Sequence, residues 1–321
     1  MTRLRIGTRG SALALWQANH IADRLGQMHG VETELVRIRT SGDRMQFAPV
    51  AQVHETINEQ IGAESGGKGI FIKELEDALL AGTIDLAVHS MKDVPTEIPE
   101  GLLFPAITRR EDPRDCLISR TGRSLKGLPT GARIGTSSLR RQAQLRSHRA
   151  DLEVLDLRGN VDTRIRRLDS GDFDAIVLAV AGVNRLGATS RVTQVMNADV
   201  MLPAVGQGAL GIETRESDAR TRELVESLND FDSRTCVTAE RALLHELQGG
   251  CQVPLGAWAQ LRDGELQIEA AVFSADGRES VRREMRGNAT EPTALGRSLG
   301  QILIEAGAGR ILRLAGRSVG L

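Results

Sequence analysis

The same succession of residues occurs twice in this chain, each time where an apolar strand pattern runs into a helical one. Residues 5–11 read Arg-Ile-Gly-Thr-Arg-Gly-Ser, and residues 133–139 read Arg-Ile-Gly-Thr-Ser-Ser-Leu. A second matching pair, 82–88 and 171–177, follows in the same order, each after a helical pattern that ends in glycine. Short matches arise by chance, but the shared order predicts two similar α/β domains that face a common cleft.

The last third of the chain has a different pattern. Apolar and polar residues alternate at 255–261, 265–274 and 278–286, and Asp-Gly turns separate these segments, which is typical of antiparallel strands. Helical patterns lie at about 233–247 and at 292–306. We therefore expect a separate α+β domain, with a three-stranded antiparallel sheet covered by the second helix.

A long connection with little pattern, residues 41–69, interrupts the first half. Around it, the apolar patterns predict strands at 3–8, 34–40, 85–88, 152–157, 175–180 and 209–213, and helices at 11–25 and 71–80. Such a connection is usually a lid or a disordered segment. It ends in Gly-Gly-Lys-Gly, but the glycine spacing of a P-loop is missing and no Ser or Thr follows Lys68.

Composition and segment lengths exclude several classes of protein. The formal net charge is −1 over 321 residues, so bulk charge gives no reason to expect nucleic acid or a membrane as partner. The longest apolar run, 175–183, is far shorter than the ~18 residues of a membrane-spanning helix, and the N-terminus lacks a signal-peptide pattern. Three widely spaced cysteines indicate neither a disulfide framework nor a metal site. We expect a reduced, cytoplasmic protein without a resident metal.

The stretch 86–95 is the strongest candidate for a functional site. It starts as a buried strand would, then presents His89, Ser90, Lys92 and Asp93, and stops at a proline. Open α/β sheets usually build their sites where strands end in such clusters. An ordinary strand end, with Asp93 capping a turn, is the alternative.

Arginine dominates the basic residues, since only four of the 41 are lysines. The planar guanidinium matches carboxylates and phosphates, which a lysine binds only as a point charge. Five arginines fall at expected strand ends or helix starts in the second half: Arg140, Arg141, Arg158, Arg164 and Arg185. Cations at helix N-termini oppose the helix dipole, so the placement favours a site for a polyanion over a solvated surface. A codon bias explains most of the excess itself.

The three cysteines differ in their surroundings. Cys236 shares a helix face with apolar residues, and Cys116 begins an apolar run, so both are expected in the core. Cys251 follows two glycines just beyond a helix, which leaves its sulfur accessible. From these residues alone, Cys251 is either a reactive thiol or an incidental one.

Seven motifs in order closely resemble the porphobilinogen deaminase family, also called hydroxymethylbilane synthases. They cover nearly the whole chain, at 7–11, 87–95, 110–115, 135–142, 157–160, 202–208 and 249–254. The resemblance implies two α/β domains like those of periplasmic binding proteins, joined by two crossover segments, and a third α+β domain. Domain 1 would comprise residues 1–108 and 204–228, with a lid at 41–67; domain 2 would comprise 109–203, and domain 3 would comprise 229–321.

The resemblance also implies a reaction and a cofactor. The enzyme, a transferase of haem and other tetrapyrrole biosynthesis, would carry a dipyrromethane bound covalently as a thioether on Cys251. Four molecules of porphobilinogen would be added head to tail to this primer, each losing ammonia, and hydrolysis would release the linear tetrapyrrole hydroxymethylbilane. The family further suggests a monomer, with porphobilinogen as its small-molecule partner.

Site residues follow from the same resemblance. Asp93 would be catalytic, because a carboxylate can bond pyrrole N–H groups, stabilise the cation left by ammonia and move protons. Each pyrrole carries an acetate and a propionate, for which bidentate arginines are the natural partners. Besides Cys251, cofactor-binding residues would be Ser90, Lys92, Ser138, Arg140, Arg141, Arg164 and Arg185. Substrate-binding residues would be Arg9, Ser11, Lys68, Phe71 and Arg158.

One departure and one alternative remain. The stretch 43–66 is longer than we expect for the family, and Glu64 stands where a lysine often precedes the Gly-Gly-Lys-Gly turn, which puts the contribution of the lid in doubt. The alternative function is a non-catalytic binding protein for small anions with the same two-domain fold. The absent signal-peptide pattern, the C-terminal domain and Cys251 argue against it.

Overall fold

The computed structural model describes residues 3–40, 72–247 and 253–318. The chain divides into two compact units, residues 1–110 with 209–234 and residues 111–208 with 235–321. Each of the three described sheets lies wholly within one unit. The expected lid at 41–67, Lys68, Phe71 and Cys251 lie outside the described residues. The three-domain boundaries expected from the sequence stay a prediction.

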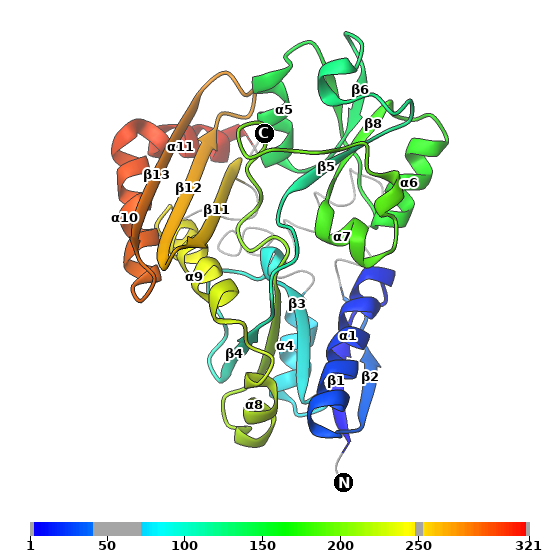
Figure 1. Cartoon of the computed structure of the whole chain (residues 1–321), viewed down its shortest axis with the longest axis vertical. Helices are drawn as coiled ribbons and strands as arrows, with labels where there is room; N and C mark the ends of the chain where they lie inside the picture. The colour runs from blue at the N-terminus through cyan, green and yellow to red at the C-terminus, as the bar shows by residue number, and fades with distance from the viewer. Residues whose placement is uncertain (1–2, 41–71, 248–252, 319–321) are drawn as a thin grey trace. The chain divides into compact units, whose positions relative to one another are not determined.

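The first unit is built on a five-stranded sheet in the order β2-β1-β3-β10-β4. Its strands are β1 (Leu4–Thr8), β2 (Thr33–Arg37), β3 (Leu86–Ser90), β4 (Leu102–Ile107) and β10 (Leu210–Arg215). Helices α1 (Ala12–His29) and α8 (Ala219–Glu226) pack on one face, where Ile21 and Val225 share a core with strand residues. Helix α4 (Lys73–Leu80) packs its buried leucines on the other face (Figure 1).

The second unit begins with a sheet of the same design, in the order β7-β6-β8-β5-β9. Its elements are β5 (Asp115–Ser119), β6 (Arg133–Gly135), α5 (Leu139–His148), β7 (Glu153–Leu155), α6 (Val161–Asp169), β8 (Ala175–Ala179), α7 (Val180–Arg185) and β9 (Gln194–Val195). Strand β6 is parallel to β7 and β8, as β1 is to β2 and β3. Each sheet also contains an inner antiparallel strand: β10 pairs with β3 in the first sheet, and β5 pairs with β8 in the second. The repeat seen in the sequence therefore marks two similar α/β domains, as predicted, although the antiparallel strand comes last along the chain in the first sheet and first in the second.

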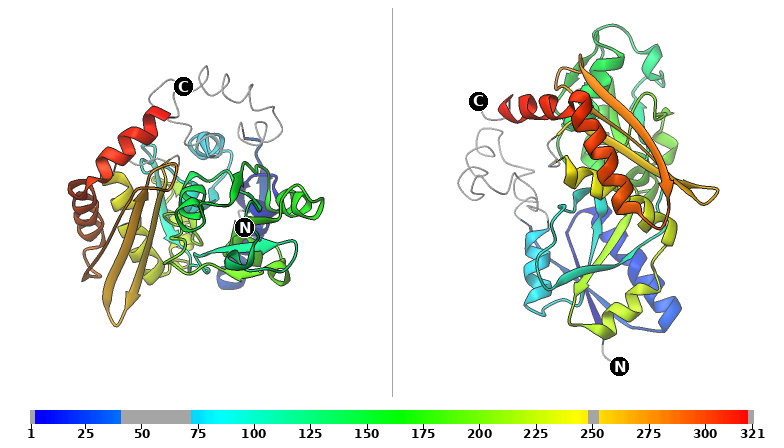
Figure 2. Two further views of the ribbon diagram at one scale, coloured as in Figure 1. Left: turned by 90° about the horizontal axis from the view of Figure 1, so that it is seen from above. Right: turned by 90° about the vertical axis from the view of Figure 1, so that its left-hand side faces the viewer.

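The second unit also contains the expected three-stranded antiparallel sheet, β11 (Leu255–Arg262), β12 (Glu265–Phe273) and β13 (Ser280–Asn288). Helices α9 (Phe231–Glu246), α10 (Pro292–Leu303) and α11 (Gly309–Ser318) contribute Leu243, Leu299 and Ile311 to its core. Figure 2 shows α10 lying along this sheet. Helices α9 and α10 approach closely, since a Cβ added to Gly296 of α10 would lie 2.1 Å from the backbone oxygen of Ala239 in α9.

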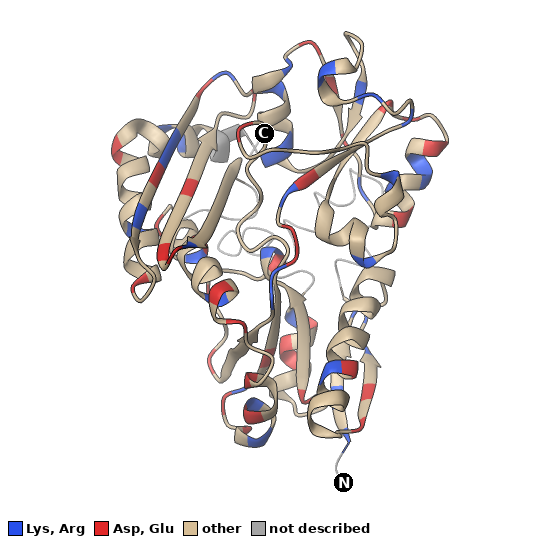
Figure 3. Ribbon diagram, viewed as in Figure 1, with Lys and Arg blue, Asp and Glu red and all other residues tan. Residues whose placement is uncertain are grey.

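Charged residues of both signs line β12 and β13 (Figure 3). Arg282 Nε lies 2.6 Å from Glu269 Oε1, and Arg286 pairs across the same two strands with Glu265. These cross-strand pairs lie on partly or largely exposed side chains. The expected three-stranded antiparallel sheet is confirmed, and with it the overall class of two α/β domains followed by an antiparallel sheet.

Candidate active site

Two loops of the first unit that are distant in sequence follow neighbouring strands at the same end of its sheet. Strands β1 and β3 are parallel, with Ile6 and Gly7 opposite Leu86 and Ala87, so the carboxyl ends of both strands lie side by side. The turn after β1 brings Arg9 and Ser11, and the end of β3 brings Ser90, Lys92 and Asp93. The structure therefore brings together five of the expected site residues.

The end of β3 is held by buried neighbours while its tip faces outward. Ser90 Oγ accepts a hydrogen bond of 2.9 Å from Gln17 Nε2 of α1. A single helical turn, Met91–Asp93, follows the strand, with Met91 buried and Asp93 exposed. Lys92 is half-buried. The carboxylate of Asp93 thus stands on a short, anchored turn rather than on a long loop.

Ser11 has a structural task of its own. It is the N-cap of α1, and its side chain accepts a hydrogen bond of 3.3 Å from the backbone N–H of Ala14. A serine oxygen in this position satisfies one of the free N–H groups at the helix start. Arg9, two residues earlier, is half-buried beside it. The role of both residues in binding substrate stays a prediction.

The corresponding edge of the second unit carries arginines. Strand β6 leads through Ser137 and Ser138 into α5, whose first turn holds Arg140 and Arg141. Because β7 and β8 run parallel to β6, Arg158, Arg164 and Arg185 follow strand ends at the same edge. The sequence pattern predicted that Arg185 follows a strand at 175–180. In the structure it is the last residue of α7, because β8 ends at Ala179 and the chain turns helical at once.

Arg140 and Arg141 are buried around one carboxylate, Asp115. Arg140 Nη1 donates to Asp115 Oδ2 at 2.6 Å, and Arg141 donates through Nε and Nη2 to Oδ1 at 3.1 and 2.7 Å. The arginine side chains are 5% and 7% exposed and that of Asp115 is 0% exposed. The two guanidinium groups hold the pKa of Asp115 far below its ordinary value against the opposing effect of burial. The cluster carries two positive charges and one negative.

The crossover segment is tied to the same cluster. Gln207 Nε2 donates to Asp115 Oδ1 at 2.9 Å and to the carbonyl of Pro113. Arg140 Nη1 also donates to the carbonyl of Leu202, and Arg141 Nη1 donates to that of Val177. Asp115 therefore fixes the two arginines and the segment 202–208 together.

The other site residues at this end of the sheet differ in their burial and in their hydrogen bonds. Arg164 Nε donates to the Gly159 carbonyl at 2.7 Å, and Arg185 Nη2 donates to the Gly208 carbonyl at 2.6 Å. Burial lowers the pKa of Arg185 to about 10, which leaves it cationic at neutral pH. Arg158 is exposed. Ser137 Oγ is buried and has no hydrogen-bond partner among the described residues.

Asp115, Gln207 and Gln17 received no role from the sequence. Asp115 opens a strand that is otherwise apolar, Asp-Cys-Leu-Ile-Ser, and an ionisable residue at that position is a signal for a buried partner. The partners themselves come from a helix and a crossover segment, so their identity depends on the tertiary fold. Gln17 lies on the buried face of α1 among apolar residues and carries a similar signal.

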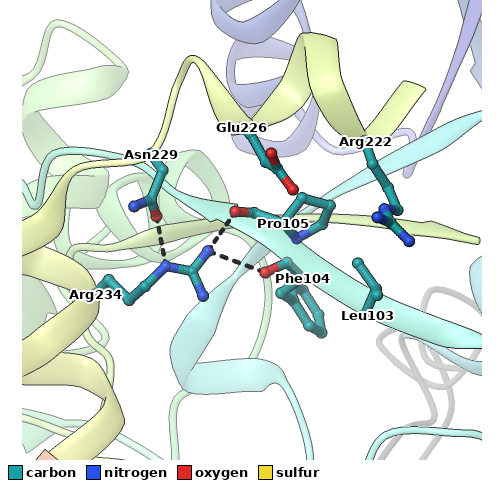
Figure 4. Close-up of a pocket in the computed structure, with 7 residues that line it drawn as sticks. All are labelled: Leu103, Phe104, Pro105, Arg222, Glu226, Asn229 and Arg234. Atoms are coloured by element: carbon teal, nitrogen blue, oxygen red, sulfur yellow. Dashed lines mark hydrogen bonds between the residues drawn. The ribbon is translucent and has the colours of Figure 1, made fainter. Parts of the chain in front are cut away.

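The pocket drawn in Figure 4 has a volume of about 550 Å³ and contains none of these residues. It is lined by residues of β4, α8, the connection after α8 and the start of α9: Leu103, Phe104, Pro105, Arg222, Glu226, Asn229 and Arg234. Arg234 is anchored there, since it donates to Asn229 Oδ1 and to the carbonyls of Phe104 and Pro105. Burial lowers the pKa of this guanidinium.

Cys116 and Cys236 are buried in the core, as predicted, and neither is part of a disulfide. Burial is the main effect that raises the pKa of Cys116, to about 12, so little thiolate forms at neutral pH. Neither thiol is placed to react. Among the described residues, no helix is long and apolar enough to cross a membrane.

Comparison with known proteins agrees with the resemblance in the motifs. A family model described as "Porphobilinogen deaminase, dipyromethane cofactor binding domain" matches residues 4–223, and one for the "Porphobilinogen deaminase, C-terminal domain" matches residues 234–305. The porphobilinogen deaminase of Syntrophobacter fumaroxidans is 49% identical over 96% of both chains. That of Pelobacter propionicus is 50% identical over 97% of this chain and 96% of the relative.

Among solved structures, the chain resembles a periplasmic substrate-binding protein of an ABC transporter from Coxiella burnetii. The identity is 14% over 70% of this chain and 91% of that one, with a TM-score of 0.41. A likeness at this score says nothing about what this chain binds. The two domain models and the relatives at about half identity are decisive: the chain belongs to the porphobilinogen deaminase family, transferases of tetrapyrrole biosynthesis that carry a dipyrromethane cofactor.

Proposed function

We propose that Asp93 is the carboxylate that acts on the reacting atoms of porphobilinogen. Its position supports this: it is exposed at the end of β3, on a turn whose first residue, Met91, is buried. Departure of ammonia from the aminomethyl group leaves a cation delocalised over the pyrrole. A fixed carboxylate favours that cation over the neutral ground state and can accept a hydrogen bond from the pyrrole N–H.

The arginines that follow the carboxyl ends of β6, β7 and β8 in the second unit provide binding for the acid side chains of the pyrroles. Arg140 and Arg141 share one carboxylate, Asp115, so the buried cluster retains one uncompensated positive charge among the described residues. Such a charge is costly without an anion nearby. Ser137 Oγ, buried without a partner, and the exposed Arg158 add a donor and a second cation at the same edge.

These residues fit a dipyrromethane, whose two pyrroles bring carboxylates of the kind that the cluster lacks. Ser138, Arg140, Arg141, Arg164 and Arg185 would hold its acid groups, and the likeness to the family adds Ser90 and Lys92 to this set. When bound, the group supplies the pyrrole carbon to which substrate is joined. Arg9, Ser11, Arg158, Lys68 and Phe71 would contact the incoming substrate.

Cys251 is the proposed attachment point of the dipyrromethane. Support comes by contrast, because the other two cysteines are buried and Cys116 has a raised pKa. A thioether forms most readily from an accessible thiolate. Porphobilinogen as substrate, a cytoplasmic location and a monomeric state complete the proposal; the last two depend on the likeness to the family.

The excess positive charge of the Asp115 cluster is the observation that carries the binding proposal. Mass spectrometry of the purified protein tests the cofactor, since a covalent adduct of two pyrroles is expected. Incubation with porphobilinogen should then release ammonia and form tetrapyrrole. The bare chain mass together with unchanged porphobilinogen would instead support a non-catalytic anion-binding protein.

A further inference from the structure

A histidine and a glutamate form a buried pair within the first unit. His89 Nε2 of β3 and Glu213 Oε2 of β10 are 2.9 Å apart, and their side chains are 3% and 0% exposed. The two atoms are not aligned as a hydrogen bond, and neither oxygen of Glu213 accepts one from the described residues. Desolvating two charges is expensive, and apolar residues of similar size often stabilise a core more. Folding alone therefore does not account for this pair.

The pair lies on the face of the sheet that also contacts the Met91–Asp93 turn. Gly211 is directly opposite His89, and Glu213 is two residues further along β10 on the same face. A Cβ added to Gly211 would lie 2.2 Å from Met91 Sδ and 2.8 Å from the Phe104 ring. The Phe104 ring also packs edge-on against His89, with ring centroids 5.8 Å apart. The side chains of Met91 and Phe104 thus close over Gly211 next to the pair.

Met91 is the first residue of the turn that ends at Asp93. It is 2% exposed, and its backbone N–H donates to the Ala209 carbonyl at 3.0 Å. The Val94 N–H donates back to the Met91 carbonyl at 3.3 Å. Any shift of the layer that contacts the Met91 side chain therefore moves the turn.

We propose that His89 and Glu213 are positioning residues, which hold the Met91–Asp93 turn in place and thereby set the rate at which Asp93 works. The inference rests on the proposed role of Asp93. The pair acts through Met91 and Phe104 and touches no substrate. The pairing matters because either buried polar side chain, left without its partner in this layer, would draw in water and displace the packing around Gly211.

Helix α4 contributes the neighbouring titratable groups: Glu76 interacts with Glu213 and His89, and the exposed Asp77 interacts with Glu76. Strand β4 contributes the uncharged Phe104. Burial, and next the charge of Glu213, raise the pKa of Glu76 to about 7, while His89 lowers it. His89 thus lies near both Glu213 and Glu76, and removing it leaves these two carboxyl groups without their basic neighbour.

The test compares Glu213→Gln, His89→Gln and the double variant with a matched control, Asp85→Asn. Asp85 immediately precedes β3 at its other end and bonds Arg5 and Arg215, so the control breaks a polar network in the same unit away from the turn. Cofactor loading is checked by mass, the folded fraction by urea unfolding, and kcat and KM by tetrapyrrole formation. All four variants and Asp93→Asn are measured in parallel.

We expect loaded, folded Glu213→Gln to lose about 10- to 100-fold in kcat with KM within about twofold, as a misplaced catalytic group would. Asp85→Asn should lose stability but keep its kcat. The double variant should lose less kcat than the two single losses multiplied together, since it leaves neither ionisable group without its partner. Parent-like kcat in Glu213→Gln, or independent effects in the double variant, would overturn the inference. Fast turnover by Asp93→Asn would instead refute the proposed role of Asp93.

Discussion

Asp115 accepts both hydrogen bonds of the Arg141 fork, from Nε and Nη2, through the single oxygen Oδ1. Its other oxygen is left for Arg140. One buried carboxylate therefore sets the orientation of two guanidinium groups. Residues expected only to bind acid groups of a ligand are also part of the folded core of the second unit.

Replacing Asp115 by Asn should cost about 3–5 kcal/mol of stability at pH 7, since it leaves two buried cations without their carboxylate. The pKa of Asp115 is depressed in the folded state, so the stability it contributes is present above the unfolded value near ~3.9 and is lost as pH falls below it. Urea unfolding at several pH values measures both effects. The exposed pair of Asp172 with Arg167 offers a control, and Asp172→Asn should cost less than about 1 kcal/mol. Equal effects of the two substitutions would contradict the assignment.

Arg140→Leu and Arg141→Leu should block cofactor loading and lower stability, whereas Arg158→Leu should load normally and elongate slowly. The first two remove bonds to Asp115, each worth about 1.5–3 kcal/mol, and Arg158 is exposed. Protein mass and the rate of porphobilinogen consumption separate the two classes. Fully loaded, fully active Arg140 and Arg141 variants would remove both residues from the binding site.

Cys251→Ser should purify without the dipyrromethane adduct, while Cys116→Ser and Cys236→Ser should retain it. A serine hydroxyl is a far weaker nucleophile than a thiolate, and the other two thiols are buried. Peptide mass mapping identifies the modified residue. An adduct on either buried cysteine would overturn the proposal.

Asp93→Asn should fold and load normally but lose about 10²–10³ in rate, because it keeps the size of the side chain and removes the charge. Asp93→Glu keeps the charge, displaced by one methylene, and should be faster than Asn. Asp93 is exposed, so neither change disturbs the core. Tetrapyrrole formation by loaded enzyme measures the effect. If Asn were faster than Glu, position and hydrogen bonding would outweigh charge.

Glu76→Gln should stabilise the protein at pH 8. Burial and Glu213 raise the pKa of Glu76 from 4.5 to about 7, so the folded state binds this proton more tightly than the unfolded chain does. Stability therefore falls as pH rises from about 4.5 to 7, and the loss persists above 7. The Gln variant, which does not titrate, should lack this contribution in urea unfolding at pH 5, 7 and 8. An unchanged pH dependence would show that Glu76 titrates normally.

Local patterns predicted much of this fold, because each pattern reflects interactions close in sequence. The turns after residues 8 and 136 both follow a strand and open a helix, and the structure has β1 with α1 and β6 with α5 at these places. The ends of strands were predicted less well. The strand expected at 152–157 is only Glu153–Leu155, since pairing with a short β6 limits its length.

Long-range partners could not be predicted from such patterns. The placement of Arg140 and Arg141 at a helix start was evident, but their burial around Asp115 depends on the contact between the start of β5 and the first turn of α5. The same holds for His89, whose partner Glu213 is far along the chain. Sequence patterns located the charged groups of the site, and the fold decided which of them neutralise one another.

The position of β10 has a consequence for biosynthesis of the chain. Ile212 of this strand is opposite Val88 on one side and Ala106 on the other, and β4 joins the described sheet through it. A ribosome must therefore make the whole of the second α/β domain before the first sheet can close. The early strands would wait with an open edge, which is prone to pair with other chains. Vectorial synthesis thus favours completion of the second domain first, although the first begins at the N-terminus.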